Sequence, residues 1–106
     1  MLDEALTSVG RRTAAERIGH ALLTLHHRAG RRGLLDQAGG LAAPFTQGDL
    51  ADALGLSRVH VNKTLRRLAG AGLIDWSEGR ISLPDPGGLA ALARMDPRAD
   101  MDLPLI

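Results

Sequence analysis

The sequence contains no cysteine, which excludes disulfide bonds, thiolate zinc sites and cysteine-bound iron–sulfur clusters within its 106 residues. Aromatic residues make up only 2% of the chain, so a core must be built from aliphatic side chains, a composition that favours packed helices. No apolar run approaches the roughly 18 to 20 residues of a membrane span, and the first residues lack the basic segment followed by an apolar stretch that is typical of a signal peptide. We therefore expect one compact domain, cytoplasmic by default, without contact to a membrane.

Positive charge is scarce overall but locally concentrated. The formal net charge is only +1. Residues 33–56 contain three acidic and no basic residues, whereas residues 57–80 contain five basic residues against two acidic ones. The five basic residues are Arg58, Lys63, Arg66, Arg67 and Arg80. This uneven distribution favours residues 57–80 as a surface for a negatively charged partner, although a basic helix face is often only a solvated surface.

Capping signals and apolar periodicity predict a helix near the start of the chain. Thr13 and Glu16 have the spacing of a capping box, in which each side chain accepts a hydrogen bond from the other residue's backbone N–H. Apolar residues then recur on one face from Ile18 to Leu25, which predicts a helix over about 13–29 with Gly30 as its left-handed C-cap. Apolar residues at helical spacing also predict the end of an earlier helix within residues 1–10; these are Leu2, Leu6 and Val9.

Two short helices separated by a glycine are predicted in the middle of the chain. Thr46 and Asp49 repeat the capping-box spacing, and the helix that they open should end at Gly55, where we expect a positive φ. Ser57 then opens a second helix, which should close at Ala71–Gly72.

A β-hairpin is predicted after these helices. Leu73–Ser77 and Arg80–Leu83 flank Glu78–Gly79, which suits a two-residue turn. This register places Trp76 opposite Ile81 on one apolar face. We therefore favour core packing for Trp76 over the alternative of a base-stacking platform.

The remaining segments carry weaker signals. Residues 30–44 contain four glycines and no sustained period, so we expect a loop there, with short strand pieces around Leu41–Phe45 as an alternative. Asp85–Pro86 suits an N-cap followed by proline at the first helical position and predicts a last short helix over Leu89–Ala93. Residues 96–106 are expected to form a flexible tail.

The outward face of the helix predicted over residues 57–71 has side chains suited to the DNA major groove. Arg58 could donate two hydrogen bonds to guanine, and Val59 could contact a thymine methyl group. Lys63 and Arg66 would attract the phosphate backbone, and Arg80 at the tip of the hairpin could reach an adjacent phosphate or the minor groove. The full set of candidate DNA-binding residues is Thr46, Ser57, Arg58, Val59, His60, Asn62, Lys63, Arg66 and Arg80.

The run TQGDLADALGLSRVHVNKTLRRL, residues 46–68, resembles the DNA-binding motif of the CRP/FNR family of transcription regulators. The resemblance extends upstream to GRRTAAERI at residues 10–18, which is similar to the family's hinge and first DNA-binding-domain helix. It extends downstream to GLIDWSEGRI at residues 72–81, which is similar to the family's wing. The resemblance implies a mainly α winged helix-turn-helix fold over residues 11–95, preceded by the tail of a dimerisation helix or hinge in residues 1–10.

The resemblance also implies function and partners. It implies a homodimeric bacterial transcription regulator that binds double-stranded DNA and has RNA polymerase as a further candidate partner. By position, Arg58, Val59 and Lys63 match base-reading residues, whereas Thr46, Ser57 and His60 match positions near phosphates. Two departures stand out: well-known members often have Glu where this chain has Val59, and the family's sensor domain is absent from the sequence. The chain is then either a truncated domain or a short standalone protein, and the operator preference cannot be transferred.

Three other kinds of function or site compete with DNA binding. The missing sensor and the near-neutral charge leave open a winged-helix module for protein interaction or dimerisation. An enzyme is not expected, because no nucleophile with a base and no phosphate-binding glycine loop is evident. His20, His26 and His27 lack the i, i+4 spacing of a helical zinc site, so we predict no metal and no cofactor.

Overall fold

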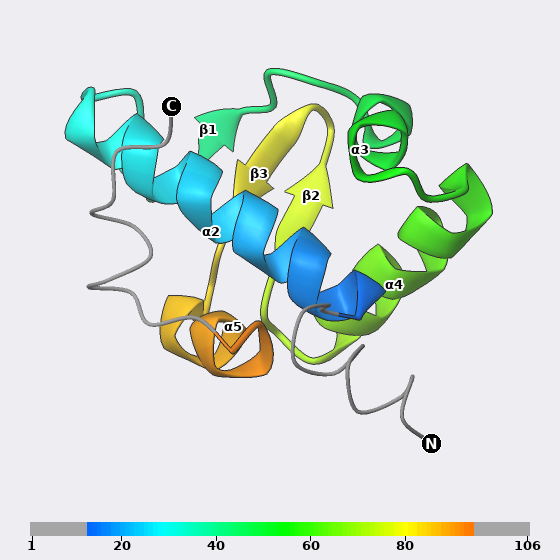
Figure 1. Ribbon diagram of the computed structural model, residues 1–106. Helices are drawn as coiled ribbons and strands as arrows, with labels where there is room; N and C mark the ends of the chain where they lie inside the picture. The colour runs from blue at the N-terminus through cyan, green and yellow to red at the C-terminus, as the bar shows by residue number, and fades with distance from the viewer. Residues whose placement is uncertain (1–12, 95–106) are drawn as a thin grey trace.

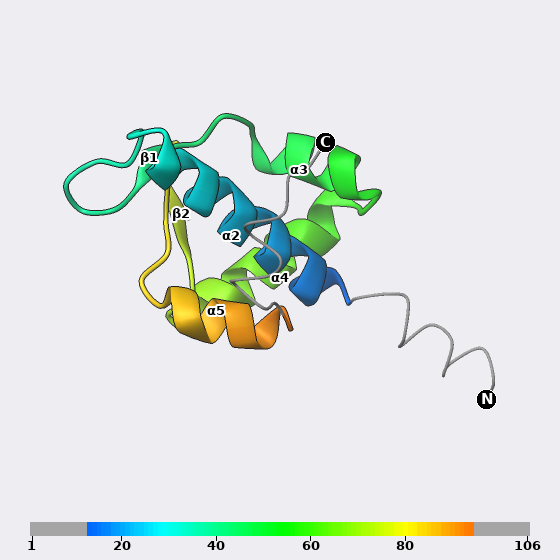
Figure 2. The ribbon, with the colours of Figure 1, turned by 60° about the vertical axis from the view of Figure 1, so that its left-hand side comes forward.

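The computed structural model describes residues 13–94, which form four helices and a three-stranded sheet. In chain order the elements are α2 (Ala14–Arg31), β1 (Leu41–Ala42), α3 (Gln47–Leu54), α4 (Arg58–Gly70), β2 (Asp75–Ser77), β3 (Arg80–Ser82) and α5 (Pro86–Leu92). Figures 1 and 2 show α2 crossing the molecule diagonally, with the strands toward one side, α3 and α4 toward the other, and α5 below. This mainly α architecture with a small antiparallel sheet confirms the predicted winged helix-turn-helix fold. The predicted helix end in residues 1–10 and the predicted tail at 96–106 lie outside the described residues.

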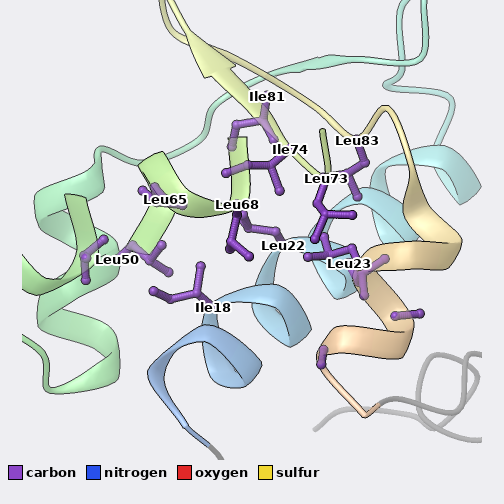
Figure 3. Close-up of a cluster of buried hydrophobic side chains, with 14 of the residues drawn as sticks. Ile18, Leu22, Leu23, Leu50, Leu65, Leu68, Leu73, Ile74, Ile81 and Leu83 are labelled. Atoms are coloured by element: carbon purple, nitrogen blue, oxygen red, sulfur yellow. The ribbon is translucent and has the colours of Figure 1, made fainter. Parts of the chain in front are cut away.

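One aliphatic core joins the elements. Ile18 and Leu22 of α2, Val61 of α4, Ile81 of β3 and Leu89 of α5 are all completely buried. Figure 3 shows side chains from α2, α4 and the hairpin converging on this core. Burial of such side chains is the main stabilising contribution, at about 1.5 to 3 kcal/mol for each fully buried aliphatic residue. The core therefore fixes the orientation of α4 relative to α2 and the sheet.

The start of α2 follows the predicted capping box. The Thr13 hydroxyl accepts a hydrogen bond from the Glu16 N–H at 3.2 Å, and the Glu16 carboxylate accepts one from the Thr13 N–H at 2.8 Å. Across the middle of α2, Gly19 permits close packing against α5, because a Cβ there would lie only 3.2 Å from Leu89 Cδ1. None of the helices in residues 13–94 combines the length and the hydropathy that crossing a bilayer requires.

The end of α2 corrects the prediction that Gly30 is the C-cap. Gly30 lies inside the helix, and Gly33 adopts the left-handed conformation with φ of 71°. The Leu34 N–H donates to the Ala29 carbonyl at 2.9 Å and the Gly33 N–H donates to the Gly30 carbonyl at 3.2 Å, the two hydrogen bonds of a Schellman motif. Gly30 instead accommodates Leu35, whose Cδ1 would lie 3.3 Å from a Cβ at that position. The sequence offers two glycines near the helix end, and the structure uses the later one, Gly33, in the left-handed conformation.

The sheet has the order β1-β3-β2 and is antiparallel throughout. Trp76 pairs with Ile81 as predicted. Glu78 and Gly79 have φ of 52° and 73°, and two consecutive positive φ values are typical of the type I′ turn that suits a two-residue hairpin. On the opposite edge of β3, Ile81 pairs with Leu41 of β1. This pairing confirms the alternative of a short strand in the Leu41–Phe45 region.

Asp85 caps the last helix as the sequence predicts, but the helix spans Pro86–Leu92 and not the predicted Leu89–Ala93. Pro86 occupies the first turn of α5, and the Asp85 carboxylate accepts a hydrogen bond from the Gly88 N–H at 2.9 Å. α5 packs against α2, and its Leu89 and Ala90 are buried in the core.

Candidate nucleic-acid interface

The turn between α3 and α4 sets the angle of the exposed helix. Gly55 adopts a left-handed conformation with φ of 70°, and the Leu56 N–H donates to the Ala51 carbonyl at 2.9 Å. Ala51 is completely buried, so its small side chain allows α3 and α4 to pack closely. From α2, Arg17 donates a hydrogen bond to the Leu54 carbonyl at 2.6 Å. This contact holds the end of α3 against α2, and no local signal in the sequence predicts it.

Helix α4 divides into a buried face and an exposed face. Val61, Leu65 and Leu68 are buried as the helical period predicts, and Thr64 joins them by donating its hydroxyl to the His60 carbonyl at 2.9 Å. On the opposite side, six predicted DNA-binding residues are exposed: Arg58, Val59, His60, Asn62, Lys63 and Arg66. Val59 is 76% exposed. Its side chain therefore contributes nothing to the core and suits an apolar contact with a partner.

The two helix starts on this surface differ in charge. The Thr46 hydroxyl accepts from the Asp49 N–H and the Asp49 carboxylate accepts from the Thr46 N–H, both at 3.0 Å. The hydrogen bond from the Thr46 N–H, together with the Thr46 side chain and the positive charge of Arg58, lowers the pKa of Asp49. The Ser57 hydroxyl caps α4 by accepting from the His60 N–H at 3.1 Å, and the first turn of α4 contains no acidic residue. The positive end of the α4 dipole is therefore not neutralised by a carboxylate in its own first turn, which favours an anion there.

Arg58 lies between these two helix starts. Arg58 is the first residue of α4, and its side chain lies against the first turn of α3 at Gly48. A Cβ built on Gly48 would lie 2.9 Å from Cζ, Nε and Nη2 of Arg58. The contact is therefore with the backbone of α3, and the residues Gly48, Asp49 and Arg58 are called the Arg58 corner below.

Arg80 is held within the wing by an ion pair that the sequence did not predict. Its Nε donates to Asp36 Oδ2 at 2.7 Å and its Nη2 donates to Asp36 Oδ1 at 2.9 Å. The guanidinium lies against Gly40, whose N–H donates to Asp36 Oδ1 at 3.0 Å. Arg80, and to a smaller extent the Gly40 N–H, hold the pKa of Asp36 well below its usual range. Asp36, Gly40 and Arg80 are called the wing clamp below.

The wing clamp changes what Arg80 can offer to DNA. The guanidinium group has five N–H donors, and Asp36 accepts from two of them. The Arg80 side chain is 40% exposed. Contact between Arg80 and phosphate thus stays a prediction, and it would have to use the remaining donors or displace Asp36.

A hollow of about 340 Å³ lies beside α4, between the start of α3 and strand β2. Polar side chains of Gln47, Asn62 and Arg66 line it together with Trp76. The Trp76 ring is half-buried and packs edge-on against Phe45 at a centroid distance of 5.9 Å, which confirms its predicted role in core packing. Gln47 was absent from the predicted site, although its position directly after the Thr46 cap could have indicated it.

Two helices joined by a glycine turn, an exposed basic second helix and a hairpin together define a winged helix-turn-helix DNA-binding domain. The family model of the Crp-like helix-turn-helix domain matches residues 16–92. The chain belongs to this family, which comprises DNA-binding domains of transcription regulators and is not an enzyme family. No curated protein gives a significant match.

Proposed function

We propose that this domain recognises a specific DNA sequence by placing residues 57–71 in the major groove. The observation that carries the proposal is the exposed face of α4, where Val59, 76% exposed, lies beside Arg58 at the start of the helix. An exposed aliphatic side chain next to an arginine provides both a thymine-methyl contact and a bidentate guanine contact. A purely electrostatic phosphate-binding surface would need only the arginine.

The proposed roles divide between base recognition and backbone contact. Arg58, Val59 and Lys63 read base edges. The remaining candidates hold the sugar–phosphate backbone or nearby base edges; these are Thr46, Ser57, His60, Asn62, Arg66 and Arg80. The Thr46 and Ser57 hydroxyls already accept a backbone hydrogen bond, so each would donate its O–H to a phosphate oxygen.

We further propose that two copies act together on a two-fold symmetric site. Paired recognition helices bind half-sites separated by one helical turn of DNA, about 34 to 36 Å. Dimerisation through the segment that includes residues 1–10, and contact with RNA polymerase, are proposals that rest on the family resemblance.

Selection of bound duplexes from a random DNA pool, followed by competition gel shifts, tests the proposal. We expect a two-fold symmetric consensus, with a selected site binding at least 10³-fold more tightly than scrambled duplex, as specific binders do. Arg58→Ala should lose about 5- to 150-fold in affinity for the selected site, mainly through one base pair per half-site. Equal affinity for every sequence would refute the proposal.

The alternative function, a protein-interaction module, gives a different result in the same system. If duplex DNA leaves the amide signals of residues 57–67 unshifted in NMR spectra while a partner protein shifts them, the exposed face of α4 binds protein. The net charge of +1 supports this alternative, but the local excess of positive charge on α4 outweighs that support.

A further inference from the structure

Gly48 gives the helix-turn-helix unit a close packing contact. The three atoms nearest to a Cβ built at Gly48 all belong to the Arg58 guanidinium group, at 2.9 Å each. Non-bonded carbon atoms prefer separations of about 3.5 to 4.0 Å, so a side chain at position 48 would overlap with the guanidinium. Arg58 can adopt this conformation only because residue 48 is glycine.

No backbone requirement explains the glycine. Gly48 lies within α3 and is not one of the glycines with a positive φ. Glycine inside a helix lowers helix stability relative to alanine, because it has more conformational freedom to lose. The space that Gly48 leaves for Arg58 is therefore the contribution that the structure shows for this residue.

Charge favours the same conformation. The Asp49 carboxylate is fixed at the start of α3 by its hydrogen bond from the Thr46 N–H. It lies close enough to Arg58 for the guanidinium charge to lower the pKa of Asp49. Attraction by Asp49 and the absence of a side chain at Gly48 thus act together on one arginine.

We propose that Gly48 is a specificity-determining position, which orients the Arg58 guanidinium between the starts of α3 and α4 for recognition of its base pair. The inference rests on the proposed function and adds a positioning residue to it. Gly48 itself would touch no base. A preorganised guanidinium loses less side-chain freedom on binding than one that must be ordered by DNA.

A double-mutant cycle on the full chain tests the coupling. Gly48→Ala, Arg58→Ala and the double variant are compared on the selected site and on a duplex changed at the base pair that Arg58→Ala identifies. Gly48→Ala should reduce the preference for the selected site by about 3- to 10-fold in the original background and leave it unchanged in the Arg58→Ala background. Equal reductions in both backgrounds would overturn the proposal, since Gly48 would then act without Arg58.

Gly87→Ala provides the matched control. Gly87 also lies in the first turn of a helix, α5, outside the helix-turn-helix unit, and a Cβ there would make only an ordinary contact, with Asp85 Oδ1 at 3.9 Å. The control variant should keep the full sequence preference. Thermal unfolding should show that both alanine variants are at least as stable as the original chain, so that a loss of preference in Gly48→Ala cannot be attributed to unfolding.

A measurement without DNA separates this inference from the proposed function. Titration of the Asp49 carboxyl group by NMR should give a higher pKa in Gly48→Ala, shifted toward the pKa in Arg58→Ala, because the guanidinium is displaced in one variant and absent in the other. An unchanged Asp49 pKa in Gly48→Ala would overturn the inference. If Arg58→Ala leaves sequence preference unchanged, the proposed base-reading role fails, and the proposed specificity role of Gly48 fails with it; the Asp49 titration still decides whether Gly48 positions Arg58.

Discussion

The wing clamp and the Arg58 corner each contain an arginine, a glycine and an aspartate. The two sites differ in how the aspartate interacts with the arginine. In the wing clamp, both carboxylate oxygens of Asp36 accept hydrogen bonds from Arg80, at 2.7 and 2.9 Å. In the Arg58 corner, one oxygen of Asp49 already accepts the Thr46 N–H, and the arginine is attracted by charge. Both aspartates also accept backbone N–H groups, so the difference between the two sites is the pair of hydrogen bonds that Arg80 donates to Asp36.

The comparison also separates two roles within one predicted interface. Asp36 and Arg80 are 44 positions apart, and their ion pair connects the loop after α2 to the wing. Asp49 and Arg58 both belong to the helix-turn-helix unit. We therefore assign a mainly structural role to the wing clamp and a mainly recognition role to the Arg58 corner, and the following predictions test this assignment.

Replacement of Gly40 or Gly48 by alanine should give the largest contrast between the two sites, measured as the change in unfolding free energy. Gly40 is buried, and a Cβ there would overlap with an Arg80 guanidinium that cannot move without breaking both hydrogen bonds to Asp36. Gly40→Ala should therefore lower the free energy of unfolding by about 1 to 3 kcal/mol. Gly48→Ala should raise it by up to about 1 kcal/mol, because Arg58 can move away and alanine favours the helix. Urea unfolding measures both, and a similar loss in the two variants would contradict the assignment.

A pair of serine substitutions should give the next largest contrast. Ser57→Ala removes the hydroxyl that caps α4 and should cost about 1 kcal/mol of unfolding free energy, together with some DNA affinity. Ser77→Ala in the wing removes a hydroxyl that donates to Asp75 at 3.2 Å on an exposed strand, and should change stability by less than about 0.5 kcal/mol. Thermal unfolding of the two variants decides this, and an equal cost would show that α4 does not depend on its cap.

Local patterns in the sequence predicted most of this fold. The capping residues Thr13, Thr46 and Ser57 and the two-residue hairpin turn all act over a few residues, so their spacing identifies them. The exposed face of α4 followed in the same way from its apolar period. The end of α2 did not, because Gly30 and Gly33 both suit a left-handed C-cap and the local pattern does not distinguish them.

The hydrogen-bond partners of Arg17 and Arg80 could not be predicted. Arg17 contacts a carbonyl 37 positions away, and Arg80 contacts a carboxylate 44 positions away. Neither partner carries a local signal, since an aspartate in a glycine-rich loop indicates a turn and nothing more. Sequence therefore predicted which residues are exposed but not which of them are already hydrogen-bonded within the protein.

The salt dependence of DNA binding should distinguish an arginine that contacts phosphate from an arginine that is held in the wing clamp. Each phosphate neutralised on duplex DNA contributes about 0.9 to the slope of log affinity against log salt. Arg66→Ala should reduce the slope by about that amount, because Arg66 is exposed on α4. Arg80→Ala should reduce it by less, because Asp36 already neutralises the guanidinium. If Arg80→Ala reduces the slope as much as Arg66→Ala, Arg80 leaves the wing clamp to contact phosphate in the complex.

The smallest expected effect is a dependence of stability on acid pH through Asp36. Hydrogen bonds from Arg80 and from the Gly40 N–H lower the pKa of Asp36 below its ordinary value of 3.8. Because the folded protein favours the ionised carboxyl, the stabilisation is fully present above about pH 4, the usual aspartate range, and is lost as the pH falls through the lowered pKa. Asp36→Asn lacks this contribution at every pH. The difference in unfolding free energy between the original chain and Asp36→Asn should therefore be largest near neutral pH and shrink below pH 4.

Urea unfolding at pH 7, 4 and 3 measures that difference. The effect should be modest, because exposed ion pairs contribute little to stability. The pKa of Asp49 is also lowered, chiefly by the hydrogen bonds with Thr46, so the variant should keep part of the acid dependence. A difference that stays constant from pH 7 to pH 3 would mean that Asp36 stabilises the fold by its shape and backbone hydrogen bonds and not by its charge. The wing would then be held by the turn around Asp36, and Arg80 would be as available to DNA as Arg58.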